Sequence, residues 1–325
     1  MRIGILSRNR TLYSTRRLIQ SARVRGHDVS VIDTMAVAVE VGADDRLEDG
    51  IKVVRAAYRP IGINPNQRVG KVHYVPKVDA IIPRIGASIT QYGLAVVRQF
   101  EACDIPTTAS STAIAQSRDK LQSLQIMSQA GLPVPRTAVI AQPSGLYAAI
   151  QTVGGTPVIV KLVQGTQGRG VLLVPNMATA YAVLDRLRGA NRQALVQEFI
   201  AEAEGKDLRV IVVGDRCVAA MTRIAANGEF RSNLHLGGTA EAAVLDKETE
   251  QLALAGVKAH GLSVAGVDIL QSNRGPLLLE VNSSPGLEGI EQVTKIDVAV
   301  EIITHLERVI AGKKKQASVV SRGRF

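Results

Sequence analysis

The chain has 325 residues, of which 46% are hydrophobic and 21% charged, so it falls among ordinary globular proteins with about two or three domains. It shows no apolar run of about 18 residues, no charged-then-apolar leader and two distant cysteines, Cys103 and Cys217, which argues against a membrane or secreted protein and favours the reducing cytoplasm. The net charge of +10 predicts an acidic partner, such as nucleic acid, an acidic protein tail or a polyanionic small molecule.

The first part of the chain opens with a β-α-β pattern. Residues 2–6 (RIGIL) and 29–33 (VSVID) form short apolar runs, and between them apolar residues recur at helical spacing until a glycine ends the pattern. This order predicts a parallel sheet packed against helices, with a third strand at 79–84 and a helix at 88–101. Residues 34–77 have turn chemistry throughout, and we expect loops with one hairpin there. No GxGxxG follows the first strand, so the dinucleotide-binding fingerprint is missing.

After residue 110 the pattern changes to one of hairpins and helices. A helix is predicted at 111–130, with Ser110 as one of its capping candidates and Gly131 as its end. The Gly214-Asp215 pair lies between two apolar runs and predicts a hairpin turn, and Asp246 and Gly261 bound another helix. The remaining predicted elements are strands at 137–141, 157–161, 170–174 and 194–200, a hairpin at 264–282, and helices at 143–153, 176–188 and 297–311.

These patterns predict an α/β protein whose C-terminal half is α+β. The N-terminal domain is expected at 1–115, followed by two subdomains at 116–193 and 194–311. Residues 312–325 (GKKKQASVVSRGRF) are basic and aperiodic, and predict a disordered tail. Such a tail would serve either solubility or contact with a ribosome or RNA.

The segment LLLEVNSSPGLEGIE, residues 277–291, places oxygen-bearing side chains at the end of an apolar strand. Glu280 and Asn282 project from the same face of this strand because side chains at i and i+2 do so. If SNRGP forms a five-residue loop, Gln271 pairs with Leu277 and Asp268 falls opposite Glu280. Carboxylate and amide oxygens together suit Mg²⁺ or Mn²⁺, so these three residues are candidate metal ligands, although a solvated strand end would also explain a lone Glu-x-Asn.

Three further segments fit a phosphate donor beside such a metal. Lys161 ends a strand and is followed by Gly165, Gly168 and Gly170, a loop whose backbone N–H groups can approach phosphate oxygens, although a plain hairpin turn is the alternative. In LVQEFI, Phe199 or Ile200 can pack against an adenine ring, although an ordinary strand reads the same way. The last segment, GEFRSNLHLGG, carries the loop donors Arg231, Ser232 and Asn233, and an arginine suits the charge on a transferring phosphoryl group.

In this order the segments resemble the ATP-grasp superfamily and, within it, the RimK-type glutamate ligases. The resemblance is carried by RIGILSR, IIPRIGASITQYG, SRDKLQS, VIVKLVQGTQGRGV, VQEFI, GEFRSNLHLGG, GVDIL and EVNSSPGLEGIE, which together span most of the chain. It implies an ATP-grasp fold preceded by a Rossmann-like parallel-sheet domain, with the central subdomain carrying the glycine-rich loop. The length of the stretch 34–77 and the basic tail depart from the family pattern.

The resemblance also implies roles for single residues. Lys120 and Lys161 would contact ATP phosphates, Glu198 and Phe199 would flank the adenine hinge, and Asp207 would take the ribose hydroxyls. Arg231, Ser232 and Asn233 would line the transfer site, with Arg231 as the catalytic residue. Asp268, Glu280 and Asn282 would hold two Mg²⁺ or Mn²⁺ ions that bridge ATP.

The implied activity is that of a cytoplasmic, homo-oligomeric ATP-dependent ligase. ATP would phosphorylate an acceptor carboxylate, and the amine of L-glutamate would attack the acyl phosphate. The implied acceptor is the C-terminus of the sixth small-subunit ribosomal protein. Two alternatives stay open: a ligase of the same fold acting on a pterin, a deazaflavin or an amino-group carrier, and a non-catalytic module that binds nucleotide or RNA.

Overall fold

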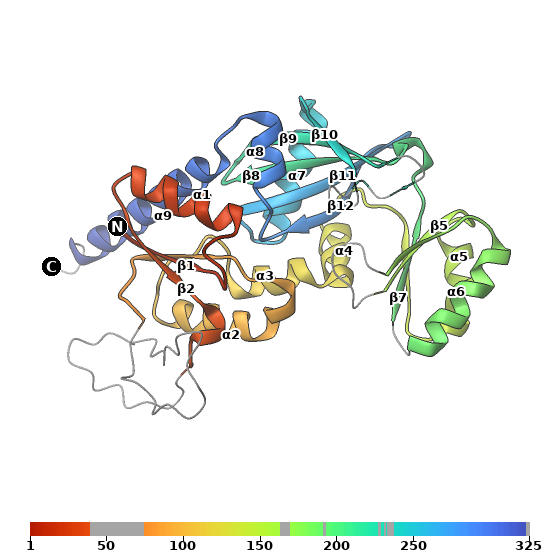
Figure 1. Cartoon of the computed structure of the whole chain (residues 1–325), viewed down its shortest axis with the longest axis horizontal. Helices are drawn as coiled ribbons and strands as arrows, with labels where there is room; N and C mark the ends of the chain where they lie inside the picture. Colours follow the sequence, from red (N-terminus) through yellow and green to blue (C-terminus); the bar gives the residue numbers. More distant parts are fainter. Residues whose placement is uncertain are drawn as a thin grey trace.

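The computed structural model describes residues 1–39, 75–162, 170–190, 193–226, 229, 230, 232 and 237–322. Three sheets lie one after another along the long axis of the molecule (Figure 1). The N-terminal sheet lies at one end, a five-stranded sheet occupies the middle, and a four-stranded sheet with two helices forms the other end. Of the predicted stretch 34–77, only residues 34–39 and 75–77 are described, and residues 34–36 form a short 3-10 helix. The rest of the stretch, with its predicted loops and hairpin, lies outside the described residues.

The N-terminal sheet is parallel, as the β-α-β pattern predicts. Its strand order is β2-β1-β3, with β1 (Arg2–Leu6) between β2 (Asp28–Ile32) and β3 (Ala80–Pro83). Helix α1 (Tyr13–Val24) connects the first two strands, and α2 (Thr90–Ala102) follows β3 after a 3-10 turn at Ala87–Ile89. Because the chain goes from β1 to one neighbour and then returns to the other, the sheet reverses its strand order beside β1.

The predicted single helix at 111–130 is wrong, because two helices form there. Helix α3 (Ser111–Arg118) is capped by Ser110, and α4 (Lys120–Gln129) begins after Asp119, whose backbone is extended at φ −81° and ψ 107°. The Asp119 side chain accepts a hydrogen bond from the backbone N–H of Gln122 at 3.0 Å and so caps α4. The break leaves the basic residues Arg118 and Lys120 on either side of the junction.

The four-stranded sheet has the order β4-β7-β5-β6 and is antiparallel throughout. The predicted boundary between residues 193 and 194 is wrong, because β7 inserts between β4 and β5 and so completes the sheet that β4 begins. Such long-range pairing leaves no local signal in the sequence. The elements of this unit are β4 (Thr137–Ile140), the 3-10 turn Pro143–Gly145, α5 (Leu146–Thr152), β5 (Val158–Leu162), β6 (Val171–Val174), α6 (Met177–Ala190) and β7 (Ala194–Glu198).

The five-stranded sheet has the order β10-β9-β8-β11-β12 and is also antiparallel. The hairpin at Gly214-Asp215 and the helix capped by Asp246 are confirmed, whereas β10 and α8 are elements that we did not predict. The elements are the 3-10 turn Ala201–Ala203, β8 (Lys206–Val213), β9 (Arg216–Ile224), β10 (Thr239–Ala242), α7 (Lys247–Ala259), β11 (Val264–Ser272), β12 (Gly275–Asn282), α8 (Glu288–Thr294) and α9 (Val298–Arg322).

The two faces of the five-stranded sheet differ in chemistry. One face is apolar along its length, and residues such as Val210, Val267 and Leu278 share a buried cluster with Leu252 and Val257 of α7. The other face is apolar only at one end, where it packs in a second cluster with residues of α8, α9 and the N-terminal sheet. At its other end this second face carries charged side chains, so the sheet leaves one polar area facing the four-stranded sheet.

The hairpin of β11 and β12 reaches the predicted pairing by a different route. Ser272 pairs with Gly275, so the turn has two residues where five were predicted, and Gln271 pairs with Pro276 where Leu277 was expected. A bulge between Asp268 and Ile269 then shifts the register by one residue. The two departures cancel, and Asp268 lies directly opposite Glu280 as predicted.

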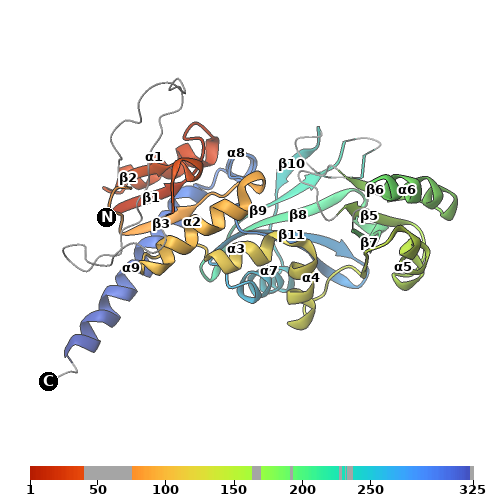
Figure 2. The same ribbon diagram turned by 90° about the horizontal axis from the view of Figure 1, so that it is seen from below.

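The prediction of a disordered tail at 312–325 is wrong for residues 312–322, because α9 continues to Arg322. This stretch contains no proline and includes alanine, glutamine and lysines, which are good helix formers. The first turns of α9 pack on α1 and on strands β8 and β9 of the five-stranded sheet, so the C-terminal helix returns to the N-terminal domain (Figures 1 and 2).

Glu291 of α8 joins three helices at this contact. Its side chain is 5% exposed and accepts hydrogen bonds from Tyr13 Oη at 2.9 Å, Arg17 Nε at 2.9 Å and the backbone N–H of Ala299 at 3.1 Å. These partners belong to α1 and α9. This carboxylate therefore joins the N-terminal domain to the C-terminal helices, together with the ion pair of Arg25 and Glu307.

We expect Glu291→Gln to lower the thermal unfolding temperature. The neutral amide weakens two charge-assisted contacts in a buried place, and such contacts contribute about 1.5–3 kcal/mol. Glu288→Gln, on the same helix but exposed, is the matched control. Equal unfolding temperatures for the two variants would show that the contact does not hold the domains together.

Candidate functional site

A row of charged side chains crosses the polar end of the five-stranded sheet. Arg209 of β8 lies opposite Asp268 of β11, and Asp268 lies opposite Glu280 of β12. Asp207, two residues before Arg209, lies opposite Arg223 of β9. Residues paired across neighbouring strands share a face of the sheet, so these five side chains, here called the charged row, project in one direction.

The charged row is held by buried ion pairs. Asp207 and Arg223 form a bidentate pair with contacts of 2.7 and 2.6 Å, and their side chains are 6% and 9% exposed. Asp268 accepts from Arg209 with both oxygens, one contact being 2.8 Å, and lies 3.0 Å from Arg223. Each buried charge thus has a partner, which offsets its loss of hydration.

These contacts set the protonation states of the row. Burial by itself would raise the pKa of Asp268, but the two guanidinium groups of Arg209 and Arg223 hold it below its usual value. Burial opposes the charge on Arg223, yet Asp268 and Asp207 raise its pKa above the ordinary value. Asp268 therefore remains ionised at neutral pH, and Arg223 remains protonated.

Lys161 of β5 approaches the charged row from the four-stranded sheet. Its Nζ donates to Gln197 Oε1 at 2.8 Å, and Gln197 in turn donates to Thr137 Oγ1 at 2.8 Å, so neighbouring strands fix its direction. Burial lowers the pKa of Lys161 to about 8, Glu280 and Asp268 act against this shift, and Lys120 adds to it. Lys161 therefore lies within electrostatic range of Lys120, Asp268 and Glu280.

The cluster has more cations than carboxylates. Besides Lys120 and Lys161, it includes Arg118, whose charge is felt by Glu280 although burial lowers its pKa. Arg209 and Arg223 are paired with Asp268 and Asp207, and the remaining carboxylate of the row, Glu280, acts electrostatically on Lys161 and Arg118. In the described part of the chain this surplus suits a polyanionic ligand such as a triphosphate.

Glu198 has a role other than open contact with a ligand. Its carboxylate accepts from the backbone N–H of Arg136 at 2.8 Å and from Arg136 Nε at 2.9 Å, and it also accepts from Arg274. Burial would raise the pKa of Glu198, but the N–H of Arg136 and the two guanidinium groups lower it. The side chain of Glu198 therefore joins β7 to Arg136, just before β4, and to the β11–β12 turn. The groups that could flank an adenine ring are then the backbone near Glu198 and the partly buried Phe199.

Several predicted residues lie outside the described part of the chain. They are Arg231, Asn233, Gly165 and Gly168, and their predicted roles stay predictions. Ser232 is described and is 8% exposed. Asp207, predicted to take ribose hydroxyls, has both oxygens on Arg223, so a ribose would have to share this carboxylate.

The predicted metal ligands lie together, with one complication. Glu280 is exposed beside the buried Asp268, and Asn282 Oδ1 accepts from the backbone N–H of Ser284 at 3.0 Å. Within the described ranges no three His, Cys, Asp or Glu side chains are placed to hold a metal, so the predicted set includes an amide beside its two carboxylates. Two carboxylates and an amide on one face fit a hard cation, which would share Asp268 with its guanidinium partners.

Sequence reasoning missed Arg209, Arg223 and Gln197. Each lies inside an otherwise apolar strand, and Arg209 follows Asp207 at i+2. A polar or charged side chain inside an apolar strand is costly to bury unless it has a partner. The positions of these residues could therefore have indicated partners on neighbouring strands. Gly266 gives another indication, because a Cβ there would lie 2.8 Å from Pro285 and 3.4 Å from Arg209, so only glycine lets the loop after β12 approach the row.

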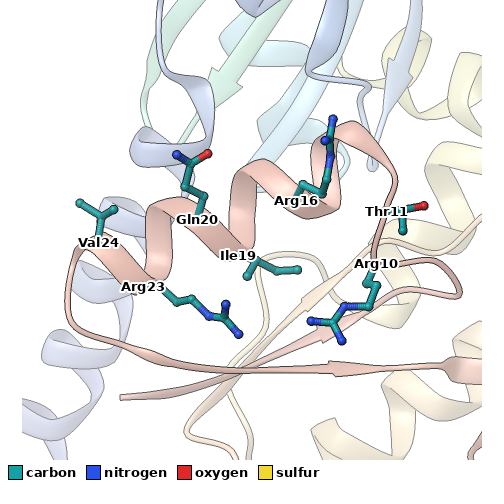
Figure 3. A pocket seen from close by; sticks show the side chains of 7 residues that line it. All are labelled: Arg10, Thr11, Arg16, Ile19, Gln20, Arg23 and Val24. Carbon is teal, nitrogen blue, oxygen red and sulfur yellow. The ribbon is translucent and has the colours of Figure 1, made fainter.

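A hollow of about 430 Å³ lies elsewhere, on α1. Figure 3 shows Arg10 and Arg23 pointing toward one another beneath the helix, whereas Arg16 points away from them. The hollow is lined only by residues between Arg10 and Val24, none of which belongs to the charged row. It is therefore a feature of the surface separate from the candidate site.

The chain matches two family models. The RimK-like ATP-grasp domain matches residues 117–306, and the RimK PreATP-grasp domain matches residues 1–47 and 50–114. A protein of Shewanella loihica called a probable alpha-L-glutamate ligase is 49% identical over 309 residues, which cover 95% of this chain and 96% of that protein. A Marinomonas protein with the same description is 48% identical over 309 residues, with the same coverage.

Solved structures share the fold at low sequence identity. An ATP-grasp RimK domain protein from Sphaerobacter thermophilus has a TM-score of 0.68 at 20% identity and covers 94% of this chain and 99% of its own. The ATP-grasp ligase PsnB, complexed with minimal precursor, Mg and ADP, has a TM-score of 0.68 at 20% identity, with coverages of 94% and 98%. The D-alanine–D-alanine ligase of Bacillus anthracis, complexed with ATP, has a TM-score of 0.63 at 16% identity, with coverages of 98% and 99%.

Among the described helices, none combines the length and apolar character needed to cross a membrane.

The pKa of Lys161 predicts a pH-dependent affinity for ADP. Phosphate favours the protonated amine, so affinity should fall as pH rises through about 8, by up to about tenfold per unit. Lys161→Arg keeps its charge at these pH values and should bind ADP with little change between pH 7 and 9.5. Calorimetric titration with ADP at fixed ionic strength would measure both, and a wild-type affinity that does not change with pH would remove Lys161 from the phosphate site.

Proposed function

The chain belongs to the RimK-like ATP-grasp family and is an ATP-dependent ligase, and we propose that it joins L-glutamate to the C-terminal carboxylate of a protein acceptor. The observation that carries the proposal is the convergence of Lys120 and Lys161 on the carboxylates Asp268 and Glu280. This arrangement places cations for phosphate beside oxygen ligands for a metal, as a phosphoryl transfer to a carboxylate requires.

The proposed reaction has two steps. An acceptor carboxylate oxygen attacks the γ-phosphorus of ATP, the bond to ADP breaks, and an acyl phosphate forms. The glutamate amine, having lost a proton, then attacks the acyl carbon, and inorganic phosphate leaves. Neither step needs a protein nucleophile, so the work of the chain is to position the reactants and to neutralise charge.

The residues of the site divide this work. Lys120 and Lys161 would hold phosphate oxygens, and Arg231, from the segment beside Ser232, would stabilise the transferring phosphoryl group. Asp268, Glu280 and Asn282 would hold one or two Mg²⁺ or Mn²⁺ ions, which supply charge neutralisation between phosphate groups. Lys161 would keep its proton when phosphate is bound, because an anion opposes the loss of its charge.

The relatives at 49% and 48% identity are described as probable alpha-L-glutamate ligases, which supports glutamate as the amino acid that is joined. Two other observations favour a peptide or protein acceptor over a small molecule. Neighbours with the same fold are complexed with precursor peptides, so the fold accommodates a peptide. The net charge of +10 suits an acceptor that becomes more acidic with each glutamate added, such as a ribosomal protein C-terminus in the cytoplasm.

The metal assignment is tested by matched carboxylate variants. We expect Glu280→Gln to fold normally, because Glu280 is exposed, but to lower glutamate-dependent ADP release by about tenfold or more with excess Mg²⁺. Glu241→Gln, an exposed position on β10 of the same sheet, should retain full turnover. Asp268→Asn should lose turnover and also unfold at a lower temperature, because it weakens the buried pairing of Arg209 and Arg223. Full turnover of Glu280→Gln would remove the metal assignment.

The acceptor is tested by mass spectrometry. The chain is incubated with ATP, Mg²⁺, L-glutamate and either the sixth small-subunit ribosomal protein or candidate pterin, deazaflavin and carrier acceptors. We expect mass increases of whole glutamyl units at the C-terminus of the protein acceptor. Glutamyl additions to a small molecule alone would favour the alternative of a same-fold ligase with a small-molecule acceptor. RNA binding that falls steeply with salt, without ADP formation on any acid, would favour the binding module.

A further inference from the structure

A second polar group lies beside Glu280 and shares only Arg118 with the cation cluster described above. It consists of Arg84, which follows β3, Arg118, which ends α3, and Ser283 and Ser284, which follow β12. Arg84 Nη2 donates to the carbonyl of Pro285 at 2.8 Å, and Arg118 donates to the carbonyl of Ile85. These two contacts bring three segments that are distant in the sequence to one place, between the N-terminal sheet and the five-stranded sheet.

This group contains several buried polar atoms without a partner. Arg118 Nε, Ser283 Oγ and Ser284 Oγ are buried and form no hydrogen bond within the described chain. Ser283 is 5% exposed. A buried polar atom without a partner destabilises a protein, so three such atoms together point to a ligand that would satisfy them.

The charges in this group are also unbalanced. Burial, and then the positive charge of Arg118, lower the pKa of Arg84 to about 10. Among the described residues, the carboxylate that Arg118 senses is Glu280, whereas none acts on Arg84. A bound water could satisfy a hydrogen bond here but could not offset the positive charge of Arg84, so these charges favour an anion as the ligand.

The topology places the group where this fold class binds ligands. In open parallel sheets, ligands bind beyond the carboxyl ends of the strands, at the point where the strand order reverses. In the order β2-β1-β3 that point lies between β1 and β3. The backbone N–H of Arg84 donates to the carbonyl of Leu6 at 2.9 Å, which places Arg84 at these strand ends.

We propose that Arg84, Arg118, Ser283 and Ser284 bind a carboxylate of the incoming L-glutamate, an inference that rests on the proposed function. Guanidinium groups match a carboxylate with paired N–H donors, whereas the lysines of the nucleotide site act as point charges suited to phosphate. Glu280 lies within electrostatic range of both Lys161 and Arg118, so the two sites are neighbours. The amine of a glutamate held here would lie beside the place where the acyl phosphate forms.

The inference is tested with steady-state kinetics and direct binding. Arg84→Gln and Arg118→Gln should each raise the KM for L-glutamate by about tenfold to a hundredfold, and Arg84→Gln, which lies outside the cation cluster at Glu280, should leave the KM for ATP within about twofold. Ser284→Ala, which removes an unpartnered hydroxyl, should raise the KM for L-glutamate a few-fold without lowering the unfolding temperature. Arg98→Gln, an exposed position on α2, is the matched control. Calorimetric titration of L-glutamate into protein saturated with a non-hydrolysable ATP analogue should show the same losses.

The substrate arms identify which carboxylate binds. If the side-chain carboxylate is held, L-glutamine should fail with the wild type, and if the α-carboxylate is held, the α-amide of glutamate should fail. A higher KM for the acceptor with an unchanged KM for glutamate would overturn the proposal, as would unchanged constants in variants that still bind ATP. A wild type without any glutamate-dependent ADP release would refute the proposed function and the inference together, whereas release in the wild type with unaffected variants would refute the inference alone.

Discussion

The pairing of Asp268 with Arg209 and Arg223 is the interaction on which the site depends. It lets a β-sheet carry buried carboxylates on the face that packs against α8 and α9 at its other end. Without the guanidinium groups, burial would favour neutral Asp268, and a neutral acid is a poor metal ligand. With them, Asp268 stays charged, and the more exposed Glu280 opposite it acts electrostatically on Lys161 and Arg118. The polar area proposed to bind phosphate and the one proposed to bind a carboxylate both lie beside this Glu280.

Much of this arrangement could be predicted from local sequence. The β-α-β opening, the helix capped by Asp246 and the pairing of Asp268 with Glu280 all follow from patterns that lie within a few residues. The failures share a physical cause, since each depends on contacts between distant segments. The break at Asp119, the insertion of β7 between β4 and β5, and the pairing of Arg223 with Asp207 are all decided by neighbours that the sequence does not place. The hairpin shows how a correct register can arise from a wrong turn, because a two-residue turn and a bulge compensate one another.

The candidate site takes residues from all three sheets. Lys161 comes from the four-stranded sheet, Glu280 from the five-stranded sheet, and Arg84 from the end of the N-terminal sheet. Glu291 fixes α8 against α1 and α9, and Arg84 fixes the loop after β12 against β3. Since each part supplies a different kind of charge, the relative placement of the three sheets determines the chemistry. Helix α9, which returns to α1, strengthens that placement from the C-terminal end.

In the proposed site, Asp268 and Glu280 of the charged row, together with Asn282, hold a divalent ion beside the phosphates of ATP. A crystal structure with a non-hydrolysable ATP analogue and Mn²⁺, whose anomalous scattering locates the ion, tests it most directly. The ion should lie about 2.1 Å from oxygens of Glu280 and Asn282, with Lys161 Nζ within hydrogen-bond distance of a phosphate oxygen. An ion bound to the phosphates but not to Glu280 or Asn282, or phosphates away from Lys161, would contradict the claim.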